Sequence, residues 1–234
     1  MRISPQNYRE EGPDGKMFPH ESIITQPIFF LFIAFSGLLT LGFYWGRKAN
    51  QRIALSALQD LVEVVKPDDQ TFTNIGGVVG YHANLFIKKK SQVKRVDATI
   101  TLLSRHAWLY FPISKLIMRY DRLFITVYLR DKFLEEGHLI EKGYSRFRGP
   151  KISNAQRLSV EDFRWGDKDF LLYYQSLKIR ESLVHLAEQK GHPGSIRHIA
   201  MVPEQKKGFV FMIPQKGRVG SEFAPIYRWI ASES

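Results

Sequence analysis

The stretch IFFLFIAFSGLLTLGFYW occupies residues 28–45 and decides how this chain is organised. No Asp, Glu, Lys, Arg or His occurs anywhere between residues 22 and 46. A helix of about 20 apolar residues is long enough to cross the hydrocarbon core of a bilayer. Pro27 suits the first position of such a helix, because the N–H that proline lacks would have no partner there. The sequence therefore predicts a transmembrane helix over residues 27–46.

Two other kinds of segment also contain long apolar runs. A buried core helix of this length usually carries a polar stripe along one side, and this run has none. A cleaved signal peptide has a basic start, a shorter apolar run and a small-residue cleavage site. Here a tail of mixed polar residues comes first, and Phe43, Tyr44 and Trp45 end the run. Both alternatives therefore fit the sequence less well than a membrane anchor.

The charges beside the run predict its orientation. The tail of residues 1–26 contains three basic and four acidic residues, whereas Arg47 and Lys48 directly follow the run. Basic residues flank the cytoplasmic end of membrane helices. We therefore expect the short tail to be extracytoplasmic and the rest of the chain to be cytosolic. Tyr44 and Trp45 would then lie at the inner headgroup level, where aromatic residues are enriched.

The chain after the anchor is predicted to fold as one α+β unit. Residues 47–66 form a juxtamembrane amphipathic helix in this prediction, since Leu58, Leu61 and Val65 recur at helical spacing. Residues 67–234 are enough for one cytosolic domain with a sizeable core. Strand and helix patterns alternate irregularly along this domain, which favours a mainly antiparallel sheet with packed helices.

The expected elements follow from periodicity and turn residues. Strands are predicted over residues 72–88, 96–102, 123–129, 139–147, 158–163, 196–201 and 209–213. Helices are predicted over residues 108–118, 170–190 and 223–230. Gly76 and Gly77 fall inside the first strand pattern and indicate a bulge or a tight bend there.

Motifs of known enzyme classes are not found in the sequence. It has no H-E-x-x-H, G-x-S-x-G, P-loop or G-x-G-x-x-G pattern. The seven histidines are scattered, and the chain contains no cysteine. We therefore predict no catalytic residue, no metal ligand, no cofactor and no small-molecule substrate. A deep polar pocket with convergent titratable groups would favour the enzyme alternative instead.

Basic clusters are the most informative polar feature of this chain, whose formal net charge is +11. We name as candidate binding residues Lys88, Lys89, Lys90, Lys94 and Arg95 in a first cluster, Arg146, Arg148 and Lys151 in a second, and Lys206 and Lys207 in a third. Surface loops are often lysine-rich for solubility alone. Three clusters on a tethered domain favour a polyanionic partner such as structured RNA or lipid headgroups, with strongly salt-dependent binding.

Small residues also recur within the predicted anchor. Ser36, Gly37, Thr40 and Gly42 could let another membrane helix approach closely. The sequence therefore names these four residues as a candidate packing face for a small membrane-protein partner. Exposure of the same residues to lipid is the alternative.

The order of segments resembles the calumin-like family, the coiled-coil-domain-containing subunits of the PAT complex and multipass translocon. The short matches are WGRKAN at residues 45–50, RLFITVY at 122–128, VHLAEQK at 184–190 and GFVFMIP at 208–214. The pattern extends over residues 28–230. This chain lacks the long acidic luminal region and the coiled coil of eukaryotic members, so it resembles a minimal, archaeal-type version.

The resemblance implies a non-enzymatic biogenesis factor that helps multipass membrane proteins insert or fold. Its partners would be the ribosome, through ribosomal RNA, and components of the Sec translocon. The membrane would be the endoplasmic reticulum in a eukaryote or the plasma membrane in an archaeon. A different class of function remains open, namely a membrane-surface lipid-binding or envelope-assembly scaffold without ribosome contact.

Overall fold

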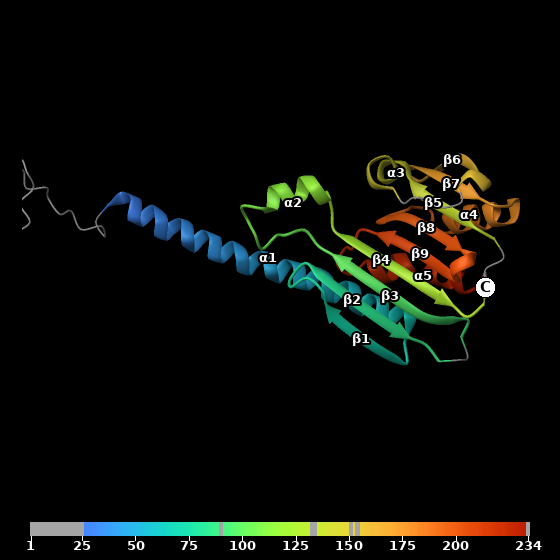
Figure 1. The fold of residues 1–234 in the computed structure, drawn as a ribbon, viewed down its shortest axis with the longest axis horizontal. Coiled ribbons are helices and arrows are strands. Elements are labelled where there is room, and N and C mark those ends of the chain that lie inside the picture. Colours follow the sequence, from blue (N-terminus) through green and yellow to red (C-terminus); the bar gives the residue numbers. More distant parts are fainter. Residues whose placement is uncertain (1–25, 89–90, 132–134, 150–151, 153–154, 233–234) are drawn as a thin grey trace, which may run out of the picture. The chain divides into compact units, whose positions relative to one another are not determined.

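A computed structural model describes residues 26–88, 91–131, 135–149, 152 and 155–232. The chain divides into two compact units, Met1–Leu41 and Gly42–Ser234. In the first unit the described residues belong almost entirely to the beginning of helix α1. The second unit holds the sheet and all the other helices (Figure 1).

Helix α1 is one continuous helix, Pro27–Val65, so the predicted anchor and the predicted juxtamembrane helix are joined without a break. It is long and apolar enough to cross a membrane, and it is the one such helix among the described residues. Only 6% of its most apolar 18-residue window is buried. A core helix of a soluble protein would be mostly buried, so the exposed apolar surface of α1 is a candidate membrane span.

Nine strands among the described residues form one sheet, in the order β1-β2-β3-β4-β9-β8-β5-β7-β6. Every recorded pairing is antiparallel, which confirms the predicted α+β class and sheet type. The strands are β1 Asp69–Asn74, β2 Gly80–Phe86, β3 Val93–Thr101, β4 Arg122–Leu129, β5 Gly137–Glu141, β6 Ser159–Trp165, β7 Lys168–Tyr174, β8 Ile196–Val202 and β9 Lys207–Met212.

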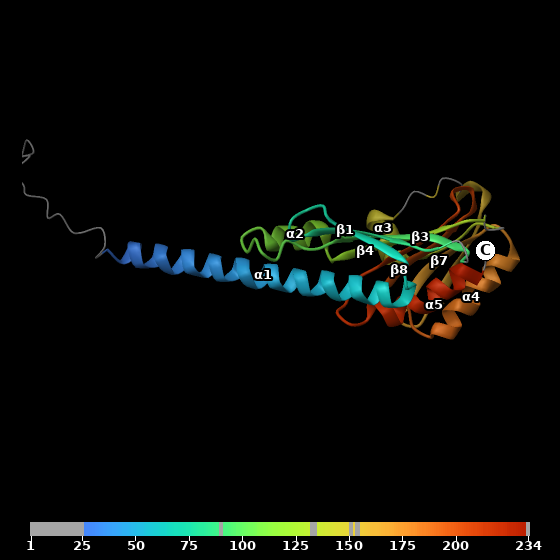
Figure 2. The ribbon, with the colours of Figure 1, turned by 90° about the horizontal axis from the view of Figure 1, so that it is seen from below.

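The sheet carries helices mainly on one face. The remaining helices are α2 Phe111–Met118, α3 Lys142–Arg148, α4 Leu177–Lys190 and α5 Val219–Ser232, with 3-10 turns at Ala155–Arg157 and Pro203–Gln205. Figure 2 shows α4, α5 and the part of α1 from Gly42 onward on the same side of the sheet. Their apolar side chains join those of the strands in one core.

Two predictions gave the wrong type of element, and the one strand predicted over residues 72–88 is two strands, β1 and β2. The segment 142–147 was expected to extend a strand, but β5 ends at Glu141 and α3 begins at Lys142. Residues 168–174 were expected to lie largely within a helix beginning at residue 170, but they form β7. Phe170 and Leu172 are buried alternately in β7, which is the pattern of a strand with one face in the core.

Gly76 and Gly77 lie in the turn between β1 and β2 rather than inside one strand. Gly77 has a positive φ of 61°, a conformation that a residue with a Cβ adopts only at a cost. The predicted tight bend is thus a hairpin turn that ends the exposed edge strand β1.

Small residues let α1 approach the loop that connects β3 to β4, which we call the β3–β4 loop (residues 102–121). Gly42 and Gly46 are buried one turn apart on α1. A Cβ on Gly42 would lie 2.5 Å from the ring of Trp108, and one on Gly46 would lie 2.2 Å from the backbone of Arg105. Only glycine therefore fits at Gly46, and the β3–β4 loop lies directly against α1.

A buried polar network fastens this contact. The side-chain amide of Asn50 donates to the carbonyl oxygens of Val78 and Leu103, at 3.1 and 2.9 Å. Arg105 donates to Asn50 Oδ1 at 3.0 Å and forms a two-pronged ion pair with Asp121 at 2.8 and 2.7 Å. Buried polar groups must be paired in this way to avoid a desolvation cost. The network therefore fixes the β3–β4 loop against α1.

Candidate polyanion-binding site

The face of the sheet away from α1, α4 and α5 presents a second set of side chains. Along β4, Leu123, Ile125 and Val127 are fully buried in the core, whereas Phe124 and Tyr128 are partly exposed. Side chains alternate between faces along a strand, so the partly exposed set belongs to the opposite face. We call this surface the open face.

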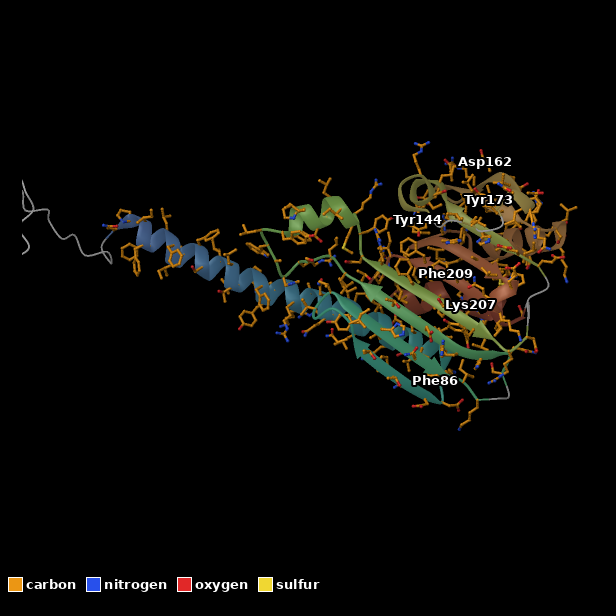
Figure 3. All side chains as sticks on the ribbon, in the orientation of Figure 1. Phe86, Tyr144, Asp162, Tyr173, Lys207 and Phe209 are labelled. Atoms are coloured by element: carbon orange, nitrogen blue, oxygen red, sulfur yellow. The ribbon has the colours of Figure 1, made fainter. Side chains whose placement is uncertain are left out.

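Four residues form a row across the open face, one each from β2, β3, β4 and β9. Phe86 pairs with Arg95, Arg95 pairs with Tyr128, and Tyr128 pairs with Lys207. The Arg95 guanidinium lies 4.3 Å from the centre of the Tyr128 ring, and Lys207 Nζ lies 5.1 Å from it. Cations near a ring face are attracted by its quadrupole. The row therefore alternates aromatic rings with cations, and Figure 3 shows Phe86, Lys207 and Phe209 on these strands.

Arg130 organises the end of the sheet beyond this row. Its Nε donates to the carbonyl oxygen of Ser91 at 2.9 Å, and its Nη2 donates to that of Ile87 at 3.0 Å. Its own carbonyl oxygen accepts a hydrogen bond from Lys206 Nζ at 2.8 Å. Arg130 thus ties the β2–β3 turn to β4, and β4 to the turn before β9.

The basic side chains at this end of the sheet form what we call the basic pole. Its described members are Lys88, Lys94, Arg95, Arg130, Lys206 and Lys207. Five carboxylates lie in or next to the same segments, namely those of Asp68, Asp69, Asp97, Asp131 and Glu204, and that of Asp97 forms an ion pair with Arg95 at 2.8 Å. The Lys88–Asp68 pair, at 3.4 Å, leaves 81% of the lysine side chain exposed, so it is readily exchanged for another anion. The pole remains net positive and accessible.

The fold joins two of the three predicted basic clusters. Lys88, Lys94 and Arg95 of the first cluster meet Lys206 and Lys207 of the third, because β3, β4 and β9 are neighbours. Lys89, Lys90 and Lys151 lie outside the described residues, as does the side chain of Arg148.

The second cluster lies at the other end of the sheet. Arg146 is exposed on α3. Gly143 and Tyr144 of that helix line a pocket together with residues of α2. Because α2 belongs to the β3–β4 loop, which connects the opposite ends of the same strands, this cluster is separate from the basic pole.

The four small residues proposed as a membrane packing face differ in their surroundings. Gly37 has nothing within 4 Å of a would-be Cβ, and Thr40 is exposed, with its hydroxyl donating to the Ser36 carbonyl at 2.8 Å. Gly42, in contrast, is buried against Trp108 of the same chain. Their role toward another membrane helix stays a prediction.

Tyr128 and Arg130 were not among the predicted site residues. The alternation in the sequence LFITVYLR places both on the face opposite to the buried leucine, isoleucine and valine residues. This alternation could have pointed to them. Their neighbours on β9 could not be read from the sequence, because the pairing of β4 with β9 joins distant segments.

Two histidines of the neighbouring strands β5 and β8 form a buried pair. The rings of His138 and His198 stack with centroids 5.7 Å apart, and Glu136 lies 2.9 Å from His138 Nε2. Neither ring nitrogen of His198 has a hydrogen-bond partner among the described residues. Within that part of the chain no three His, Asp or Glu side chains gather as metal ligands would.

We expect the histidine pair to make stability depend on pH. Burial, and to a lesser degree the neighbouring His138, hold the pKa of His198 well below its ordinary value. In the unfolded chain His198 therefore binds a proton near pH 6.5, whereas in the folded chain it stays neutral, so stability falls as the pH falls. Between pH 7 and 5.5 the free energy of unfolding should drop by about 1 kcal/mol. Denaturant titration of the full chain in detergent measures this drop.

His198→Phe should make that pH dependence shallower, because phenylalanine does not titrate, while the buried His138, whose pKa is also lowered, keeps part of it. Phenylalanine suits the aromatic neighbour Phe209, whose ring lies 5.2 Å from that of His198. His185→Gln on the exposed side of α4 is the matched control and should leave the slope unchanged. An unaltered slope in His198→Phe would contradict the assignment.

No protein-family model matches this chain, and no curated protein is detectably similar to it in sequence. The resemblance to the calumin-like family therefore stays a prediction.

Proposed function

We propose that this chain is a single-pass membrane protein whose sheet-bearing unit binds ribosomal RNA beside the Sec translocon, where it assists multipass membrane proteins as they insert or fold. In this proposal α1 crosses the membrane with its N-terminus outside, and the open face and basic pole are cytosolic. The protein acts by docking and not by catalysis.

The observation that carries the proposal is the row of alternating rings and cations on the open face. RNA-binding sheets use aromatic side chains to stack bases and cations to hold phosphates. Phe86 is 39% exposed and lies directly beside Arg95, so a base and a phosphate could be bound together. A lysine-rich loop that serves only solubility would not require rings and cations to be aligned across four neighbouring strands.

The position of the basic pole favours RNA over lipid headgroups. The pole lies at one end of β3, and the β3–β4 loop, which contacts α1 where its apolar run ends, lies at the other end. Nine residues of strand separate the two ends by up to roughly 27 Å. Attraction between exposed charges is largely screened beyond about 8 Å at physiological salt. The pole is therefore better placed to meet a large partner than its own membrane.

Ribosome binding by the full chain in nanodiscs should depend on the basic pole. We expect the triple variant Lys88→Gln, Lys94→Gln, Lys207→Gln to bind purified ribosomes roughly 50-fold more weakly at 0.15 M salt, with a salt slope shallower by about 2. The reason is that three fewer phosphates release their counterions. Co-sedimentation across a salt series measures both quantities.

A control variant with the same change in charge separates the effect of losing the site from the effect of lowering the net charge. Lys178→Gln, Arg164→Gln, Arg228→Gln removes three exposed basic side chains outside the pole and should keep at least most of the affinity. Equal losses of ribosome affinity in both variants would show that net charge, and not the basic pole, determines binding. Equal binding of the wild type to anionic vesicles and ribosomes would favour the lipid-scaffold alternative. Crosslinking in native membranes tests the Sec translocon as a neighbour.

A further inference from the structure

Helix α2, in the β3–β4 loop, exposes its apolar side chains and buries a polar one. It reads FPISKLIM, yet the one residue that it buries is Ser114, whose hydroxyl oxygen accepts a hydrogen bond from the Ser104 N–H at 3.2 Å. Leu116 is 87% exposed, and Ile113 and Ile117 are about half exposed. A surface helix of a soluble protein turns its apolar side chains to the core. Helix α2 turns them outward.

The residues before α2 extend the same apolar surface. Leu109 is 70% exposed, and Trp108 and Tyr110 are each close to half exposed. Contiguous apolar patches of this kind are rare on monomeric soluble proteins and mark an interaction site. The β3–β4 loop therefore presents an apolar surface that some other phase or molecule covers.

The location of this surface points to what covers it. The Trp108 ring lies against Gly42, and His106 forms an edge-to-face contact with Phe43 at 5.9 Å. Gly42 and Phe43 are near the C-terminal end of the apolar run of α1, next to the exposed Tyr44 and Trp45. The apolar surface thus begins next to the C-terminal end of the candidate span, which the proposed function places at the lipid headgroups.

Basic side chains border the apolar surface. Lys115, Arg119 and Arg122 line a pocket of about 530 Å³ together with Tyr144 of α3. Arg122 Nη2 donates to the Met118 carbonyl oxygen at 3.3 Å, while its buried Nε atom has no hydrogen-bond partner among the described residues. Arginine and lysine side chains bind phosphate groups, such as those of lipids, through charge-assisted hydrogen bonds. The exposed Arg146 on α3 adds a further positive charge nearby.

We propose that the β3–β4 loop is an interfacial membrane-binding element. The exposed side chains of Leu109, Ile113, Leu116 and Ile117 enter the boundary between headgroups and acyl chains, and the basic border binds lipid phosphates. Interfacial helices combine such an apolar side with basic and aromatic residues. This assignment rests on the membrane anchoring in the proposed function. It gives the sheet-bearing unit a second attachment to the bilayer, which fixes its orientation there.

The chain contains no cysteine, so single-cysteine variants report one position each. Leu116→Cys in the full chain, labelled with an environment-sensitive fluorophore and reconstituted into vesicles of neutral and anionic phospholipids, places the probe on α2. We expect blue-shifted emission, strong quenching by lipids that carry a nitroxide on the acyl chain, and little quenching by aqueous iodide. Leu177→Cys, at a residue 66% exposed at the start of α4, should behave in the opposite way.

A third probe tests the membrane anchor independently of the interfacial assignment. Phe35→Cys lies within the apolar run and should also be quenched by the acyl-chain nitroxide. If the probe at Phe35 is quenched and that at Leu116 meets only iodide, the interfacial assignment is wrong and the anchor stands. If neither is quenched by lipid, both are wrong. Quenching at Leu116 in vesicles without any other protein supports lipid over a protein partner.

Discussion

Gly46→Leu is expected to destabilise the sheet-bearing unit by about 3 kcal/mol or more. Its Cβ alone would lie 2.2 Å from the Arg105 carbonyl group and 2.4 Å from the His106 nitrogen. These are backbone atoms, so no side-chain rotation relieves the overlap. Leucine forms helices better than glycine by somewhat under 1 kcal/mol, which is too little to offset the overlap. Thermal or denaturant unfolding of the full chain in detergent measures the loss.

Gly37→Leu is the matched control for that experiment, because it makes the same change in the same helix. A Cβ at Gly37 meets nothing within 4 Å, so the variant should be as stable as the wild type or slightly more so. Equal stability of the two variants would mean that α1 does not pack on the β3–β4 loop as described.

Asp121→Ala should cost roughly 3 kcal/mol of folding free energy, the second large effect. The carboxylate accepts two hydrogen bonds from Arg105 and one from the Leu103 N–H, at 2.7–2.8 Å. Its side chain is 7% exposed, and that of Arg105 is 24% exposed. Removing the carboxylate leaves a guanidinium and a backbone N–H without their partner in a largely dry site. Denaturant titration of the full chain gives the value.

A double-mutant cycle shows whether the cost comes from the ion pair. Asp121→Asn keeps an acceptor for the Leu103 N–H, and Arg105→Met removes the charge while keeping most of the chain length. The double variant should lose less stability than the two single variants together, since no unpaired charge remains. For comparison, Asp169→Ala breaks an exposed 3.5 Å pair with Arg164 and should change stability by at most about 0.5 kcal/mol. Additive losses in the cycle would argue against the network.

Much of the fold can be predicted from local sequence patterns, because each pattern reflects the burial of one face of a strand or helix. The run LFITVYL predicts β4, and the alternation in residues 96–102 predicts most of β3. The strand at residues 168–174 is not evident from the sequence, because an apolar run of this length is equally consistent with a helix that continues into α4. Alternate burial of Phe170 and Leu172 distinguishes the two only once the neighbouring strands are known.

The candidate site could be predicted from the sequence even less completely than the fold. Each basic cluster is visible in the sequence, but their grouping is not, because only the pairing of β4 with β9 brings Tyr128 beside Lys207. The sequence also predicts a helix near residues 108–118 without revealing that its apolar side faces outward. That outcome depends on Ser114 being buried, which is a property of the packed loop and not of the segment.

The pairing of β4 with β9 also determines the order in which the chain can fold while it is being made. Strands β1 to β4 follow one another and pair as neighbours, so they can assemble as soon as they are synthesised. Residues 207–212 are made much later, and until then β4 is an unpaired edge that carries Leu123, Ile125 and Val127. Non-local pairing of this kind is slow, and exposed apolar edges invite aggregation. The half-made chain is therefore its most vulnerable form, and synthesis of the C-terminal strands protects it.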